Sequence, residues 1–185
     1  MRRWNGWGDD SFVYDLPDSA ARYARETLGP GRPPKDVPLD AVLAQVPPSR
    51  LPAHPLISAD AEARVRHARG QSFPDWVAMR SGQLGAFPDG IAFPQDREQV
   101  RELLEFATAH NVALIPYGGG SSVVGHVNPI AGERPTLTVD MTRMNRLLTF
   151  DRESQLATFG AGVSGPELEA QLRAHGYTLG HYPQS

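Results

Sequence analysis

The sequence has no cysteine, a single lysine at Lys35 and no long run of apolar residues. Without cysteine, the chain forms no disulfide, no thiolate metal site and no cysteine nucleophile. Its apolar runs are too short to span a bilayer and its first residues lack the apolar core of a signal peptide, so we expect a cytoplasmic protein without a transmembrane segment. The net charge of −3 at pH 7 leaves no basic surface for nucleic acid, which favours a small-molecule partner.

The positions of proline divide the chain. At 185 residues it is long enough for one domain with a buried core and an added arm, but a second complete domain would not fit comfortably. Prolines crowd an early stretch at Pro30, Pro33, Pro34, Pro38, Pro47, Pro48, Pro52 and Pro55. We therefore expect an arm of short helices and proline-rich links over residues 1–86, followed by a domain over residues 87–185.

Two short helices are expected near the end of this arm. Residues 61–68 and 74–79 have helical patterns, and Asp60 and Ser72 stand where N-caps are preferred. The same stretch carries a cluster of arginines, namely Arg64, Arg66, Arg69 and Arg80. Either a solvated basic face or contact with an acidic ligand or another domain explains this cluster.

From Phe87 onward, strand and helix patterns alternate. A short strand at residues 91–93 is followed by Asp96 and Gln99, which form a capping box, and then by apolar residues at helical spacing. A strand that ends at Ile115 completes a strand-helix-strand unit.

Three more strands and one more helix are expected after this unit. The β-rich runs are residues 136–140, 146–150 and 155–160. Ser164 and Glu167 form a second capping box, which opens a helix that stops at Gly176, and residues 177–179 begin another strand. The sequence thus predicts an α+β, or mixed α/β, domain with a short sheet plus helices.

The most informative segment is residues 116–125, PYGGGSSVVG, directly after an apolar stretch at residues 112–115. Three consecutive glycines strip the backbone of side chains and allow positive φ, so neighbouring N–H groups can converge on an anion. The hydroxyls of Ser121 and Ser122 follow at once. These features suit a pyrophosphate.

Two common phosphate-binding motifs do not fit this segment. A P-loop needs Gly-Lys-Ser/Thr at its end, where no lysine stands, and a dinucleotide fingerprint needs glycine in place of Val123. Pro129, Gly132 and Pro135 leave no helix for the loop to enter, so the cradle would be a backbone nest. A flexible Gly-Ser linker is the alternative, although valines on both sides argue against a solvated linker.

The order of these features resembles the first part of the flavin-binding domain of the vanillyl-alcohol oxidase and p-cresol methylhydroxylase (PCMH-type) superfamily. Within it, three segments are similar to the alkylglycerone-phosphate synthase family: WNGWG at residues 4–8, DMTRMNR at residues 140–146 and GHYPQS at residues 180–185. The resemblance covers essentially the whole chain. It implies a PCMH-type FAD-binding domain that follows an irregular helical arm and is incomplete at its C-terminus.

In that superfamily the glycine loop surrounds the FAD pyrophosphate, and other segments also contact the cofactor. The resemblance implies these cofactor-binding residues: Pro116, Gly118, Gly119, Gly120, Ser121, Ser122, Val123, Asp140, His181, Gln184 and Ser185. Asp140 would lie near the adenosine part, and an aspartate that merely caps the turn after a strand is an equal alternative. Gln184 departs from the acidic residue that relatives often have at this position.

The histidines indicate neither a covalent flavin nor a metal site. Some members of the superfamily attach the flavin through a histidine just after the glycines, but here Ser121 holds that position and His126 lies further along. The resemblance therefore implies non-covalent FAD, with His126 exposed in the loop. The other histidines lie in or beside helical patterns without ligand-like spacing: His54, His67, His110 and His175.

The resemblance implies the exchange of an acyl for an alkyl group on acylated dihydroxyacetone phosphate, a step of ether-lipid synthesis. Other relatives are oxidases or dehydrogenases of 2-hydroxy acids such as glycolate and lactate, which is the alternative. The family's acid-base and substrate-phosphate residues lie beyond the position that matches Ser185, so we expect an inactive part of a flavoenzyme that forms a homodimer when complete. A stand-alone FAD-binding module and a non-catalytic paralogue stay open.

Overall fold

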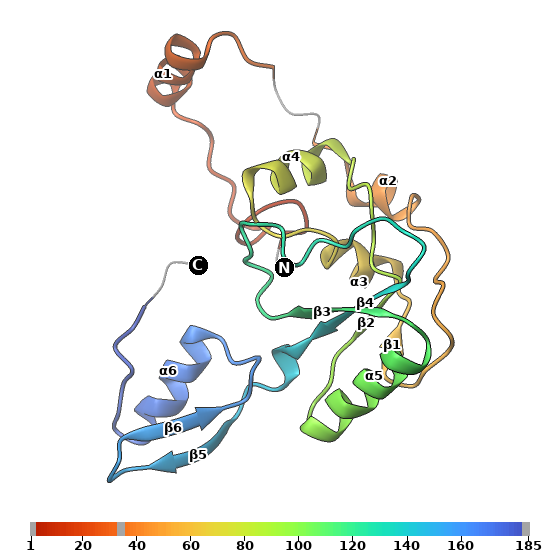
Figure 1. Cartoon of the computed structure of the whole chain (residues 1–185). Helices are drawn as coiled ribbons and strands as arrows, with labels where there is room; N and C mark the ends of the chain where they lie inside the picture. Colours follow the sequence, from red (N-terminus) through yellow and green to blue (C-terminus); the bar gives the residue numbers. More distant parts are fainter. Residues whose placement is uncertain (1–2, 33–35, 183–185) are drawn as a thin grey trace.

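The chain folds into a four-stranded sheet with helices beside it and a separate two-stranded hairpin that carries its own helix (Figure 1). The computed structural model describes residues 3–32 and 36–182. This mixture of helices with a mixed sheet confirms the predicted α+β class.

The four-stranded sheet has the order β1-β2-β4-β3. Its strands are β1 (Ile57–Ser58), β2 (Gly90–Ala92), β3 (Ala113–Tyr117) and β4 (Thr136–Asp140). The last three run parallel, and β1 pairs antiparallel with β2. Every residue of the central strand β4 is buried, as expected for a strand with neighbours on both sides. Proline at Pro116 is tolerated because β3 lies at the edge of the sheet.

Helix α5 (Arg97–Ala109) connects β2 to β3, and β4 later inserts between these two strands. Its apolar side, with Leu103 and Phe106, packs against Leu137 and Val139 of β4 in the main hydrophobic core. Only one of the two hydrogen bonds of the predicted capping box is present. Asp96 accepts from Gln99 N, but the Gln99 side chain accepts from Gln95 N instead of completing a reciprocal box.

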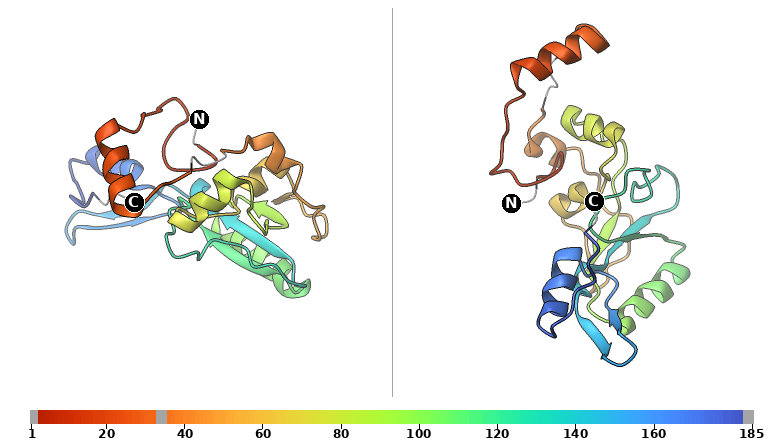
Figure 2. Two further views of the ribbon diagram at one scale, coloured as in Figure 1. Left: turned by 90° about the horizontal axis from the view of Figure 1, so that it is seen from above. Right: turned by 90° about the vertical axis from the view of Figure 1, so that its left-hand side faces the viewer.

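The described part of the arm contains four helices: α1 (Asp18–Leu28), α2 (Leu39–Leu43), α3 (Ala61–Arg66) and α4 (Phe73–Ser81). The caps predicted at Asp60 and Ser72 are both present, and Ser72 forms a full capping box with Asp75. Val42, Val65 and Met79 belong to a second hydrophobic cluster shared by α2, α3 and α4. Helix α1 buries none of its side chains and stands apart from the other elements (Figures 1 and 2).

The arm and the sheet are joined by an ion pair between a half-exposed arginine and a buried aspartate. Arg50 donates to both carboxylate oxygens of Asp89, with Nε–Oδ1 and Nη2–Oδ2 distances of 2.8 Å. Asp89 also accepts from Thr136 N at the start of β4. One arginine of the predicted cluster is structural, since Arg64 is 2% exposed and donates to the carbonyl oxygens of Pro47 and Pro88. A solvated basic face is therefore wrong for this residue.

The second lobe consists of the hairpin β5 (Leu147–Asp151) and β6 (Leu156–Phe159), with helix α6 (Gly165–Arg173). A single turn of 3-10 helix, Met141–Arg143, leads into it from β4. The capping box of Ser164 and Glu167 is confirmed. At Gly160 and Gly162 a Cβ would overlap the carbonyl oxygens of Met144 and Met141, so the backbone crosses too closely for any other residue.

The strand predicted from residue 177 is wrong. Residues 177–182 have no strand partner among the described residues. Instead, Glu169 of α6 accepts hydrogen bonds from Thr178 Oγ1 (2.7 Å), Leu179 N (3.1 Å) and Gly180 N (3.0 Å). The carboxylate satisfies backbone donors that a neighbouring strand would otherwise have satisfied.

Candidate functional site

The glycine loop begins where β3 ends. Tyr117 is opposite Asp140 in the parallel pair of β3 and β4, so both strands end at the same edge of the sheet. Clefts at the carboxyl ends of parallel strands are common ligand sites. The described residues 121–135 contain no helix, as predicted, so this loop offers a backbone nest and no helix N-terminus of its own.

The loop is anchored to the segment between α3 and α4. Gln71 N donates to Ser122 O at 2.7 Å, and Gly70 N donates to Asn128 Oδ1 at 2.9 Å. Asn128 in turn donates to Asp75 Oδ1 at 2.7 Å. Because Gly70 lies directly against Ser122 O, a Cβ at this position would overlap that oxygen. This anchoring contradicts the alternative of a flexible linker.

Gly118 and Gly119 have open space in front of them. A Cβ added at either position would meet no described atom within 4 Å, and neither residue has positive φ. Gly120 differs, since it is buried and has a φ of 67°. The backbone conformation requires glycine at Gly120, whereas neither conformation nor packing requires it at the other two positions.

A cleft of about 1000 Å³, here called the loop cleft, opens in front of these glycines. Gly118, Gly119 and Ser121 line one wall. The opposite wall contains residues 161–166, at the N-terminus of α6, and His181. The structure therefore brings His181 to the same cleft as the predicted loop contacts, from about sixty residues further along the chain.

Other predicted contacts lie around this cleft without lining it. Pro116 is in β3, Ser122 accepts from Gln71 N and from His126 N, and Val123 is exposed. His126 is exposed in the loop, as predicted. The contacts predicted at Gln184 and Ser185 lie outside the described residues.

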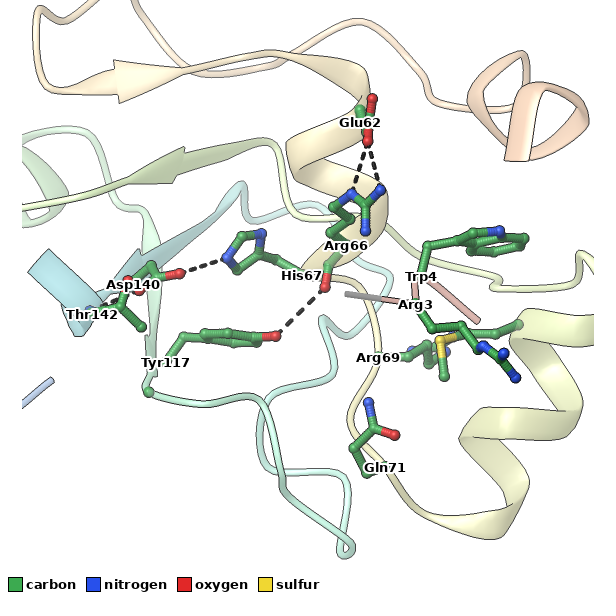
Figure 3. A pocket seen from close by; sticks show the side chains of 12 residues that line it. Arg3, Trp4, Glu62, Arg66, His67, Arg69, Gln71, Tyr117, Asp140 and Thr142 are labelled. Carbon is green, nitrogen blue, oxygen red and sulfur yellow. Dashed lines mark hydrogen bonds and ion pairs between the residues drawn. The ribbon is translucent and has the colours of Figure 1, made fainter. Parts of the chain in front are cut away.

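Asp140 is buried at the end of β4 and both its carboxylate oxygens are engaged. Oδ1 accepts from Thr142 N at 2.8 Å, the capping role foreseen as its alternative. Oδ2 lies 2.8 Å from Nε2 of His67 (Figure 3). Nδ1 of the same ring is 2.7 Å from Ala63 O. A carbonyl and a carboxylate are both acceptors, so each ring nitrogen of His67 faces an acceptor.

Electrostatics favour the ionised form of Asp140. Burial alone would raise the pKa of Asp140, but hydrogen bonds from His67 and Thr142 outweigh burial and hold this pKa below its ordinary value. The ring of His67 also lies against Tyr117, with ring centroids 4.4 Å apart. Tyr117, at the start of the glycine loop, thus packs against the histidine that directly follows α3.

Comparison with known proteins identifies the domain. A family model described as an FAD binding domain matches residues 88–185, just over half of the chain. The chain belongs to this FAD-binding family. FAD is therefore its cofactor, as predicted, and the match begins one residue after the start predicted for the domain.

Relatives of this FAD-binding chain include alkyldihydroxyacetonephosphate synthases, where dihydroxyacetone phosphate is another name for glycerone phosphate. The protein of Dictyostelium discoideum is 34% identical over 99% of this chain and 36% of its own length. That of Trypanosoma brucei brucei is 38% identical over 70% of this chain and 21% of its own length. The chain thus spans only about a third of the Dictyostelium relative.

A solved structure of an alkyldihydroxyacetonephosphate synthase has the same fold. The two structures align over 98% of this chain and 39% of the synthase chain, with a TM-score of 0.82 and 32% sequence identity. The predicted resemblance to the alkylglycerone-phosphate synthase family and the PCMH-type FAD-binding fold are confirmed. Within the part of the chain that the structure describes, no helix is both long and apolar enough to cross a membrane.

Sequence reasoning missed several residues of the FAD-binding domain and its surroundings. His67 and Arg69 face the start of the loop, and residues 161–164 line the loop cleft. The sequence did offer a signal for residues 161–164, because Gly160 and Gly162 come shortly before the capping box that starts at Ser164. Among the described residues, no three His, Asp or Glu side chains gather as a metal site would require.

Proposed function

We propose that this chain forms the diphosphate-binding part of the FAD site in a flavoenzyme that exchanges an acyl for an alkyl group on acyl-dihydroxyacetone phosphate. The observation that carries the proposal is that Gly118 and Gly119 line the loop cleft and that a Cβ at either position would meet no described atom within 4 Å. A side chain would fit there in the absence of a ligand, so close approach of a ligand to the backbone is what explains the two glycines.

The chain's own residues have distinct tasks in this proposal. N–H groups of the loop from Gly118 to Ser122 would bind the diphosphate, and the anchors from Gly70 and Gln71 keep this loop in place. The N-terminus of α6 adds the positive end of a helix dipole on the opposite wall. When bound, FAD would supply a flavin ring whose N5 atom carries the exchange chemistry.

The remaining contacts belong to the same proposal. His181 would contact the cofactor from the wall of the loop cleft beyond α6. Glu169 accepts hydrogen bonds from residues 178–180 and so positions His181 at this wall. Gln184 and Ser185 would continue this contact. Asp140 would support the cofactor site by holding Thr142 and His67 in place through its hydrogen bonds with them. We further propose that FAD is bound non-covalently and that the protein is cytoplasmic and, with the parts its relatives have, homodimeric.

The test is an FAD titration of the Gly119→Ala variant. A Cβ at Gly119 meets no described atom within 4 Å, so the variant should melt like the wild type. If loop N–H groups bind the diphosphate, displacing one charge-assisted hydrogen bond should weaken FAD binding about 10- to 100-fold. Gly132→Ala is the matched control, since its Cβ also meets open space.

Flavin fluorescence during the titration gives the affinity, and circular dichroism gives the melting temperature. Wild-type affinity in Gly119→Ala would refute the proposed role of the loop. The FAD-loaded chain alone should show no acyl-to-alkyl exchange, because it spans only about a third of the Dictyostelium relative and the resemblance implies acid-base and substrate-phosphate residues outside that span. Measurable exchange by this chain would contradict that assignment.

A further inference from the structure

A second cavity, of about 370 Å³, lies beside the loop cleft and shares Gly118 and Thr142 with it. Three arginines, Arg3, Arg66 and Arg69, line it, so we call it the arginine pocket. Figure 3 shows these side chains on the side of the cavity formed by α3 and the N-terminal segment, across from the start of the glycine loop.

The carboxylates in the wall of the arginine pocket are already paired. Glu62 lies 2.7 Å from Arg66 Nη2, and Asp140 lies 2.8 Å from His67 Nε2. Arg3 has a looser partner, since its Nε is 3.7 Å from a half-exposed carboxylate of Asp10. The positive charges that line the cavity therefore exceed the negative ones.

Arg69 is the cation without a paired anion. Among residues 3–32 and 36–182, no carboxylate lies within ion-pair distance of its guanidinium, and its Nη1 donates to Ala68 O at 3.2 Å. Burial lowers the pKa of Arg69, against the attraction of Asp75. Asp75 is itself bound by Ser72 and Asn128. A partly desolvated guanidinium with unused donors favours a bidentate anion.

We propose that the arginine pocket binds a phosphoryl group, with Arg69 as its main cationic ligand. The guanidinium fork matches phosphate oxygens, and the adjoining loop backbone at Gly118 would supply further donors. This phosphoryl group has two possible sources: the diphosphate of the cofactor, reaching past Gly118, or a separate phosphate monoester. The assignment adds a site beyond the glycine loop and does not require the proposed enzymatic reaction.

The test is calorimetric titration of the full 185-residue chain with inorganic pyrophosphate and with inorganic phosphate. Loss of a charged hydrogen-bond donor should weaken pyrophosphate binding about 10- to 100-fold in Arg69→Gln. Arg69→Lys should recover part of the affinity, because it restores the charge but not the fork. Arg97→Gln is the matched control, since the Arg97 side chain is 90% exposed and lies on α5, away from the pocket.

FAD titrations distinguish the two sources. A separate monoester site is identified by two results together: phosphate still binds when the chain is saturated with FAD, and Arg69→Gln binds FAD with wild-type affinity. Phosphate that FAD displaces, together with weaker FAD binding in Arg69→Gln, identifies the cofactor diphosphate. Wild-type chain that binds neither anion, or a folded Arg69→Gln variant that binds pyrophosphate, phosphate and FAD normally, overturns the proposal.

Two further results keep this test separate from that of the glycine loop. If the chain binds no FAD but binds pyrophosphate in a way that depends on Arg69, the proposed function is refuted. The anion site in the arginine pocket is then still supported. If Arg69→Gln does not fold, the comparison of Arg69→Lys with wild type decides the matter. Equal anion affinities in those two proteins would overturn the proposal.

Discussion

Substitution of Gly70 by alanine should destabilise the chain and impair the glycine loop together. Gly70 lies in the connection between α3 and α4, where its N–H donates to Asn128 and the next N–H, of Gln71, donates to Ser122 O. A Cβ at Gly70 would overlap Ser122 O and lie 3.3 Å from Val127 Cγ2. The loop must therefore move away, which stretches or breaks the hydrogen bond to Ser122.

The size of the effect follows from these contacts. Overpacking costs about 1–3 kcal/mol, and the loss of one internal hydrogen bond costs about 0.5–1.5 kcal/mol. We expect a combined loss of about 3 kcal/mol in the free energy of unfolding, which lowers the melting temperature of a chain of this length by about 6–12 °C. FAD affinity should fall as well, because the displaced segment contains the proposed diphosphate contacts.

Circular dichroism melting and flavin fluorescence titration measure the two effects in the same preparation. Gly132→Ala is the control, because its Cβ meets no described atom within 4 Å. Should Gly70→Ala melt and bind FAD like the wild type, the close contact between Gly70 and Ser122 would not hold the loop. A loss of stability with normal FAD affinity would refute only the link from this contact to the cofactor.

Two other carboxylates lead to predictions. Burial alone would raise the pKa of Asp89, but hydrogen bonds from Arg50 and Thr136 leave it below its ordinary value of 3.8, so this group stabilises the chain above about pH 4 and loses its contribution as the pH falls further. Asp89→Asn should therefore lose about 1–3 kcal/mol in urea unfolding at pH 7 and show a shallower acid dependence, and an unchanged acid profile would contradict this. Glu169→Gln should weaken FAD binding in fluorescence titrations, because the neutral amide accepts less strongly from Thr178, Leu179 and Gly180; wild-type affinity would show that these bonds do not position the cleft.

Helix starts could be predicted from the sequence because their determinants are local. Ser72 and Ser164 each bond to a residue three positions later, and each forms the full reciprocal box. The cap at Asp96 is less predictable in detail, because the Gln99 side chain accepts from Gln95 N and not from Asp96 N. The existence of these capped helices was therefore predictable, while the partner of a flexible side chain was not. Helices α1 and α2 follow Pro17 and Pro38 without a side-chain cap, and no local signal placed them.

Features that depend on distant residues could not be predicted in the same way. The pattern at residues 177–179 resembles a strand, but a strand requires a partner, and here the carboxylate of Glu169 takes the backbone donors instead. The contact between His67 and Asp140 joins positions 73 residues apart. Nothing near His67 in the sequence distinguishes it from a surface histidine, so the arginine pocket emerges only when α3 is placed beside the ends of β3 and β4.

Glycines look alike in a sequence, yet in this fold they satisfy different constraints. Gly70 and Gly162 allow close approach of two backbone segments, and Gly120 has positive φ. Substitution at these positions should first affect stability. Gly118 and Gly119 meet neither constraint, so a substitution there should affect ligand binding while the fold remains intact. The loop predicted from the sequence as one phosphate cradle thus divides into a part that the fold requires and a part that the proposed diphosphate contact would explain. Separate measurements of melting temperature and FAD affinity distinguish the two.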